Sequence, residues 1–179
     1  MTAQVALLRA INVGGNASVK MADLRQLVAD RGLARARTVL QSGNLVFDSA
    51  GVVGSDLEKM LEAALKDRFG LVTDVLVRSA TEWSQLIAHN PLPEEARAHP
   101  AHLLVVCLKD QPAASGVEAL DRVPGPERVR AWTNQLFVSY PDGIGRSRLT
   151  MSVIERALGL RGTARNWNTV GRLESLLRA

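Results

Sequence analysis

The order of strand-like and helix-like apolar patterns is the feature that most narrows the folds open to this chain. Residues 4–8 form a short apolar run, and residues 21–28 place apolar side chains at helical spacing. Two strands then flank Ser42-Gly43, an amphipathic helix follows, and the next strand covers residues 72–77. This βαββαβ order predicts a ferredoxin-like α+β lobe over residues 1–79.

The second half of the chain repeats this order. A buried strand is expected at 102–108, a short helix follows, and a hairpin is expected with strands 128–132 and 135–139. Helical patterns then cover residues 150–158 and the end of the chain. We therefore predict a second ferredoxin-like lobe over residues 80–179, in which an extra C-terminal helix replaces the final strand. The two βαββα(β) lobes are expected to arise by internal duplication and are compact enough to count as one domain.

Helix starts and one hairpin register can also be predicted. The pattern Ser-x-x-Glu occurs at Ser55, Ser79 and Ser115, and each occurrence predicts a capping box that begins a helix. A two-residue turn at Ser42-Gly43 predicts the cross-strand pairs Gln41–Asn44 and Val39–Val46.

The cysteine content and the apolar runs of the chain indicate the cellular compartment in which the protein resides. The one cysteine, Cys107, lies in an apolar run, so no internal disulfide can form and a reducing compartment is favoured. The chain has no run of about 18 apolar residues, and its opening residues lack the pattern of a secretory signal. A cytoplasmic protein without membrane contact is expected.

Positive charge gathers in the last third of the chain. Residues 126–179 hold nine arginines and four acidic residues, whereas residues 1–125 hold thirteen basic and fourteen acidic residues. The excess favours anionic partners such as phosphate groups, but it is smaller than the dense basic stripes of dedicated nucleic-acid binders.

The first candidate site is the loop that follows the first strand. Arg9, Asn12, Gly14 and Gly15 precede a predicted helix, and paired glycines allow backbone N–H groups to turn toward an anion beside Arg9. The spacing differs from that of the phosphate loop and of the dinucleotide fingerprint. In the alternative interpretation the glycines only turn the chain, and Asn12 caps backbone groups.

Two further candidates combine polar turns with helix starts. Gln41, Ser42 and Asn44 either close a hairpin or contribute to a ligand site, and no histidine is spaced to make Ser42 a nucleophile. Donor side chains also gather before the last two helices, where they suit an oxyanion or else cap the helices. These residues are Arg146, Ser147, Arg148, Arg165, Asn166, Trp167 and Asn168.

Three segments carry a resemblance to a known family. They are LLRAINVGG at 7–15, QSGNLVF at 41–47 and TARNWNTV at 163–170, together with GRSRL at 145–149. In this order, and over essentially the whole chain, they resemble the bacterial family called domain of unknown function 1697. The resemblance implies two ferredoxin-like α+β lobes and no particular activity. Ala10 and Arg148 depart from the glycine and the lysine that are usual in the family.

The leading functional expectation is the binding of an anionic ligand, phosphate-bearing or a nucleotide, in a cleft between the lobes. One alternative is an RNA-binding module on the second-lobe hairpin, where Arg128, Arg130, Trp132 and Phe137 share one strand face. Another is a hydrolase or transferase whose base is unidentified. No metal site or cofactor is expected, and the catalytic residues, the ligand and the oligomeric state stay open.

Overall fold

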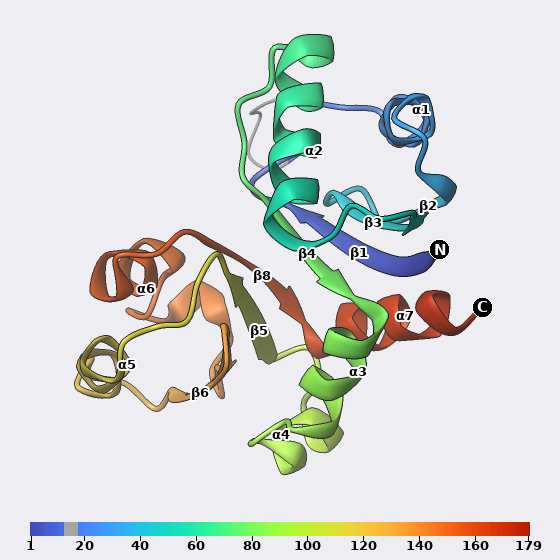
Figure 1. Cartoon of the computed structure of the whole chain (residues 1–179). Coiled ribbons are helices and arrows are strands. Elements are labelled where there is room, and N and C mark those ends of the chain that lie inside the picture. The colour runs from blue at the N-terminus through green and yellow to red at the C-terminus, as the bar shows by residue number, and fades with distance from the viewer. Residues whose placement is uncertain (13–17) are drawn as a thin grey trace. The chain divides into compact units, whose positions relative to one another are not determined.

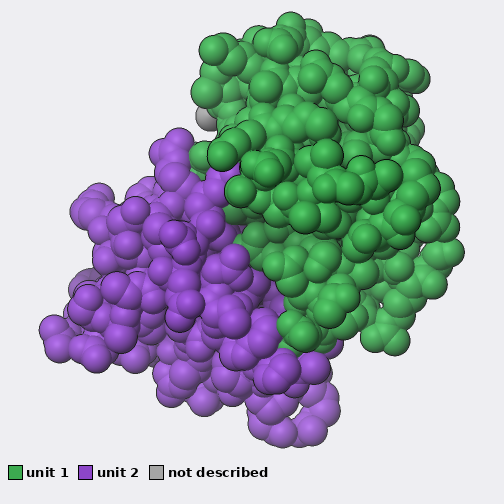
Figure 2. Space-filling model, in the orientation of Figure 1, with its two compact units in different colours: residues 1–85, 172–179 green, residues 86–171 purple. Residues whose placement is uncertain are grey.

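The structure is a computed structural model that describes residues 1–12 and 18–179. It contains two compact units, each built around one four-stranded antiparallel sheet (Figure 1). Unit 1 comprises Met1–Gln85 and Arg172–Ala179, and unit 2 comprises Leu86–Gly171 (Figure 2). The predicted α+β class with two similar lobes is confirmed.

The first sheet has the predicted βαββαβ connectivity. Its strands lie in the order β2-β3-β1-β4, and α1 and α2 cover one face (Figure 1). That face is apolar because alternate strand residues, such as Ala6, Phe47 and Val77, meet Leu24 and Leu61 of the helices. The elements are β1 (Thr2–Leu8), α1 (Met21–Asp30), β2 (Ala34–Val39), β3 (Asn44–Ser49), α2 (Gly54–Phe69) and β4 (Val75–Ser79).

The second sheet repeats this topology, with the strand order β6-β7-β5-β8. The predicted replacement of its final strand by a helix is wrong, because a short strand precedes that helix and pairs with β5. This strand escapes sequence analysis since it lies at a sheet edge and only Ala164 packs against the core between the sheet and its helices. The elements are β5 (Leu103–Leu108), α5 (Ala114–Asp121), β6 (Arg128–Trp132), β7 (Gln135–Ser139), α6 (Met151–Leu158) and β8 (Gly162–Asn166).

Matching hydrogen bonds at the strand ends support an internal duplication. Leu8 donates its N–H to Gly43 O at 2.8 Å, and Leu108 donates its N–H to Asn134 O at 3.0 Å. The residue that follows each leucine donates its N–H to the loop before the last strand of its repeat, at 2.9 and 3.0 Å. Equivalent backbone groups thus meet at equivalent points in the two halves.

The helices that follow the last strands are also equivalent. Ser79 forms the predicted capping box with Glu82 at the start of one helix, and Asn166 accepts the N–H of Thr169 at 3.0 Å at the start of the other. The C-terminal helix is therefore the counterpart of the helix after β4, and each repeat reads βαββαβα. These helices are α3 (Ala80–Ala88) and α7 (Trp167–Arg178), and α4 (Pro93–Ala98) lies between the repeats.

The two hairpins differ in how well their register could be predicted. The second hairpin matches the prediction, with Trp132 opposite Gln135. In the first, Val39 lies opposite Asn44, so a four-residue turn at 40–43 replaces the predicted two-residue turn. The first and last residues of this turn have left-handed backbone, with φ values of 59° and 70°, which allows the longer connection.

Side chains cover the outer edge of β4. Val75 donates its N–H to Glu62 Oε1 at 2.9 Å, and Val77 donates its N–H to Glu58 Oε1 at 2.8 Å. Arg78 completes the edge by donating to Val77 O at 2.7 Å. These side chains bond to backbone groups that a further strand would otherwise pair.

A buried tyrosine anchors the chain that leaves β7. Tyr140 is 1 % exposed and donates its hydroxyl to Leu149 O at 2.9 Å. Burial raises the pKa of Tyr140 to about 12, because the phenolate would lose its hydration, and the nearby Glu127 adds to the increase.

Alkaline pH should therefore destabilise the fold through Tyr140. The unfolded chain releases the phenol proton near pH 10.0, whereas the folded chain holds it to about pH 12. The stability that the neutral phenol contributes is thus present below about pH 10 and lost as the pH rises toward about 12. Urea unfolding at about pH 9 and about pH 11 should show a larger loss in the wild type than in Tyr140→Phe, which cannot titrate. Equal losses would contradict this assignment.

Candidate functional site

The side chain of Asn12 connects three chain segments at the end of β1: its own loop, the segment before α1 and the β2–β3 turn. Its side-chain amide donates to Val19 O at 3.0 Å and to Gln41 O at 2.8 Å, and its Oδ1 accepts the N–H of Val19 at 2.8 Å. The predicted candidates after β1 and in the β2–β3 turn are therefore neighbours. Gly14 and Gly15, which belong to the first candidate, lie outside the described residues.

Unusual backbone conformations concentrate at this end of the first sheet. Of the five described non-glycine residues with positive φ, three lie here: Ala10 at 50°, Asn12 at 54° and Leu40 at 59°. Each such residue costs roughly 1 to 3 kcal/mol, and such strain tends to cluster at functional sites. A glycine at position 10 would adopt this conformation with little strain.

The turn at 40–43 is held together by its own side chains. Asn44 is fully buried and donates to Val39 O at 2.9 Å and to Ser42 Oγ at 3.0 Å. Gln41 is exposed, and its carbonyl oxygen accepts the Asn12 amide. Asn44 and Ser42 thus stabilise the conformation of the turn, and Gln41 is the most exposed of the predicted ligand-binding residues in it.

Two basic residues and the start of α1 lie at the same end of the sheet. α1 begins shortly after Val19, and among the described residues no side chain caps its first turn, which follows the exposed Lys20. Arg9 is half-buried, and its backbone is held by Asp74 O and by Thr73 Oγ1, the latter 2.5 Å from Arg9 O. No sequence signal pointed to Thr73, because it reaches Arg9 only through the pairing of β4 with β1.

In the second repeat, the predicted 146–148 segment is mostly exposed. Arg146 ends a short 3₁₀ helix, η1 (Ile144–Arg146), and both Arg146 and Arg148 face solvent. Ser147 Oγ accepts the N–H of Leu149 at 2.9 Å. Thr150 then caps α6. The serine therefore serves the local backbone, whereas the two arginines point outward.

The edge of β8 resembles that of β4, with one substitution. Gly162 donates its N–H to Glu155 Oε1 at 3.1 Å, as the first residue of β4 donates to Glu62. Four residues before Glu155, Met151 stands where Glu58 stands in the first repeat. The second repeat therefore lacks the equivalent of the buried Glu58 carboxylate.

Arg165 occupies the edge position that Arg78 has in the first repeat. It donates from Nη1 to Ala164 O at 2.8 Å and to Thr163 Oγ1 at 2.7 Å. Burial lowers the pKa of Arg165 to about 10, and the nearby Cys107 offsets this effect only in part. The equivalence with Arg78 gives Arg165 a structural role at the edge of β8.

The second sheet separates the arginines that were predicted to surround one oxyanion. Arg165 lies opposite Val105 in the β5–β8 register, on the face away from α5 and α6. The segment with Arg146 and Arg148 leads instead to Leu149, which packs in the core beneath those helices. Within unit 2 the predicted donors thus form two separate groups.

The start of α7 uses several of its predicted residues internally. Asn166 caps the helix, and Trp167 donates its N–H to Pro100 O at 3.1 Å. The Trp167 ring lies 6.4 Å from the Phe137 ring, and Asn168 is exposed. The cap and the aromatic contact explain two of these residues structurally.

The strand face considered for RNA is only partly exposed. Phe137 is fully buried, so its ring is not available to stack on a base. Trp132 stacks on His89 with 4.7 Å between ring centroids. Arg128 and Arg130 each form an ion pair with an acidic side chain of the same unit. The open aromatic platform that RNA binding requires is therefore incomplete.

Within 1–12 and 18–179, no group of three or more histidine, cysteine, aspartate or glutamate side chains could hold a metal ion. No helix in this described part of the chain is both long enough and apolar enough to span a bilayer. Cys107 is buried in β5.

Two equivalent βαββαβα repeats define an α+β protein of duplicated ferredoxin-like lobes. The family described as "Protein of unknown function (DUF1697)" matches residues 1–137, and the chain belongs to this family, as the sequence motifs predicted. A similar solved structure is that of the conserved bacterial protein SP0830 from Streptococcus pneumoniae, with a TM-score of 0.76 and 18% identity over 98% of both chains. At this identity the likeness concerns the fold. A comparison with curated proteins finds no match.

Proposed function

We propose that this protein binds a phosphate-bearing anion at the end of β1, with Arg9 and the first turn of α1 as the main contacts. The observation that carries the proposal is the Asn12 clamp, which joins the loop of Arg9, the β2–β3 turn and the segment before α1. A guanidinium and the N–H groups at a helix start both complement a phosphate.

A nucleotide is the larger ligand that this end of the sheet would accept. Leu40 is 49 % exposed in the turn next to Gln41, although it is a large apolar residue. Such a side chain offers a contact for a base or a sugar, while Arg9 and Lys20 would meet the phosphates. A cleft shared by the two lobes stays a prediction.

Titration calorimetry with inorganic phosphate, pyrophosphate and ATP tests the proposal. Arg9→Ala should weaken the tightest of these about tenfold or more, because a hydrogen bond to a charged group contributes about 1.5 to 3 kcal/mol. Lys109→Ala is the matched control, since Lys109 follows β5 as Arg9 follows β1 and its loss changes the net charge equally. Equal weakening in both variants, or no binding by the wild type, would overturn the proposal.

A further inference from the structure

The outer edge of β2 differs from the other sheet edges. Side chains bond to the outward backbone of β4 and β8, and Arg130 Nη1 donates to Val129 O of β6 at 2.7 Å. Among the described residues, the backbone of Ala34–Val39 bonds only to β3 and to the Asn44 side chain. An open strand edge is a template for another extended chain.

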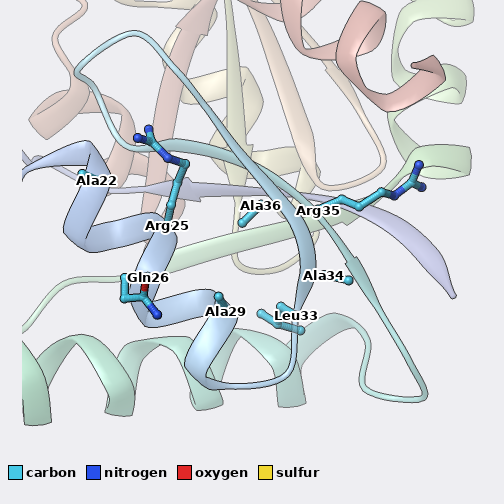
Figure 3. A pocket seen from close by; sticks show the side chains of 8 residues that line it. All are labelled: Ala22, Arg25, Gln26, Ala29, Leu33, Ala34, Arg35 and Ala36. Carbon is cyan, nitrogen blue, oxygen red and sulfur yellow. The ribbon is translucent and has the colours of Figure 1, made fainter.

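A groove of about 500 Å³ lies between this strand and α1 (Figure 3). Small side chains line it, with Ala22 and Ala29 on the helix and Ala34 and Ala36 on the strand. Leu33 is the buried apolar residue of the lining. These alanines leave room for the side chains of a peptide that extends along β2.

The groove is positively charged. Arg25 and Arg35 line it, whereas no carboxylate does (Figure 3). Arg25 reaches from α1 to β2, where its Nη1 donates to Thr38 Oγ1 at 2.8 Å. Arg35 pairs with Asp48, yet its side chain is 66 % exposed. Acidic side chains on an incoming chain would complement both guanidinium groups.

The same charges disfavour a second copy of this chain as the occupant. Antiparallel self-pairing of Ala34–Val39 would bring Arg35 and Arg37 of one copy next to those of the other, and like charges across a strand pair destabilise it. The bulge between Ala34 and Arg37 also shortens the regular stretch available for self-pairing.

We infer that β2 and the groove beside α1 bind an extended acidic segment of a partner protein by strand addition. In the regular stretch of β2 the outward N–H and C=O are those of Thr38, since Arg37 and Val39 bond to β3. The main chain of the partner pairs with Thr38, and its alternate acidic side chains meet Arg25 and Arg35. Because the regular stretch is short, charge supplies much of the affinity, and binding falls as salt rises. This site shares only the first turn of α1, at Ala22, with the site proposed for the phosphate-bearing anion, and it uses neither Arg9 nor Lys20.

Fluorescence anisotropy with a labelled, blocked peptide of alternating glutamate and valine tests the inference on the full chain. The glutamate peptide should bind about tenfold more tightly than its lysine counterpart. Arg25→Glu should weaken the glutamate peptide by about the same factor. Arg31→Glu makes the same charge change at an exposed residue outside the groove and should alter binding by less than about twofold.

Peptide N-methylation separates strand addition from simple charge attraction. Only alternate amides of an added strand face β2, so methylating one set should abolish binding, whereas methylating the other set should be tolerated. Tolerance of both sets, or equal binding of the glutamate and lysine peptides, would overturn the inference. A wild-type dimer in sedimentation that the peptide cannot dissociate would assign the edge to a second copy instead.

Discussion

Replacing Glu58 by alanine should lower the free energy of unfolding by about 3 to 5 kcal/mol. Glu58 is 7 % exposed, and its Oε1 accepts the N–H of Val77 at 2.8 Å and lies 3.8 Å from Arg78 Nη1. The alanine would remove this carboxylate from a buried guanidinium and the acceptor from a buried N–H. Both changes are costly where water cannot replace the lost partner.

Glu62→Ala is the matched control for this prediction. Glu62 is only half-buried and accepts the N–H of Val75, so its loss should cost about 1 kcal/mol. Chemical denaturation of both variants measures the difference, and Glu58→Gln, which keeps an acceptor oxygen, should fall between them. A cost for Glu58→Ala no larger than that for Glu62→Ala would show that the charge pair with Arg78 does not stabilise the fold.

Gly43→Ala should cost about 2 to 4 kcal/mol, from left-handed strain and overpacking together. Gly43 has a φ of 70°, and a Cβ at this position would lie 2.7 Å from Ile11 Cδ1 and 2.9 Å from Leu8 Cβ. Both neighbours are buried, so neither can move without disturbing the core. Because Leu8 and Ile11 flank Arg9, we also expect weaker anion binding by this variant.

Gly32→Ala provides the comparison for Gly43→Ala. Gly32 has a similar φ of 76°, but a Cβ there meets nothing within 4 Å, so only the conformational cost of about 1 kcal/mol remains. In an Ile11→Ala background, which lacks both Cδ1 and Cγ1 of Ile11, Gly43→Ala should cost less stability than in the wild type. Urea denaturation measures all these variants, and equal costs for the two glycine substitutions would contradict the steric argument.

Capping boxes show where local prediction succeeded and failed. The Ser79 box is confirmed, because Glu82 bonds back to Ser79 at the start of α3. The box at Ser55 is wrong, since Glu58, its acidic member, instead accepts a backbone N–H of β4. The box at Ser115 is also wrong, because α5 begins at Ala114 without a side-chain cap. The same four-residue pattern thus has different roles, depending on the strand that packs beside it.

Most residues of the candidate site were predicted individually, but the sequence did not show which of them lie together in the fold. Arg9 and Asn12 were predicted in one loop and Gln41 in a separate turn, and the Asn12 amide joins the two. Thr73 had no signal in the sequence. Arg165, which was predicted as an anion contact, proved to match Arg78 in position, and this match depends on the pairing of β8 with β5.

Apolar periodicity by itself determined the class, the order of most strands and helices, and the register of the second hairpin, because each of these depends on residues close together in the chain that bury one face. Only the tertiary structure decided that a polar segment forms β8 and that the first hairpin has a four-residue turn. It also decided that Glu58 accepts a backbone N–H of β4 and does not cap the start of its own helix. Those outcomes arise from backbone groups at sheet edges and in turns, and their hydrogen-bond partners come from segments that are distant in sequence.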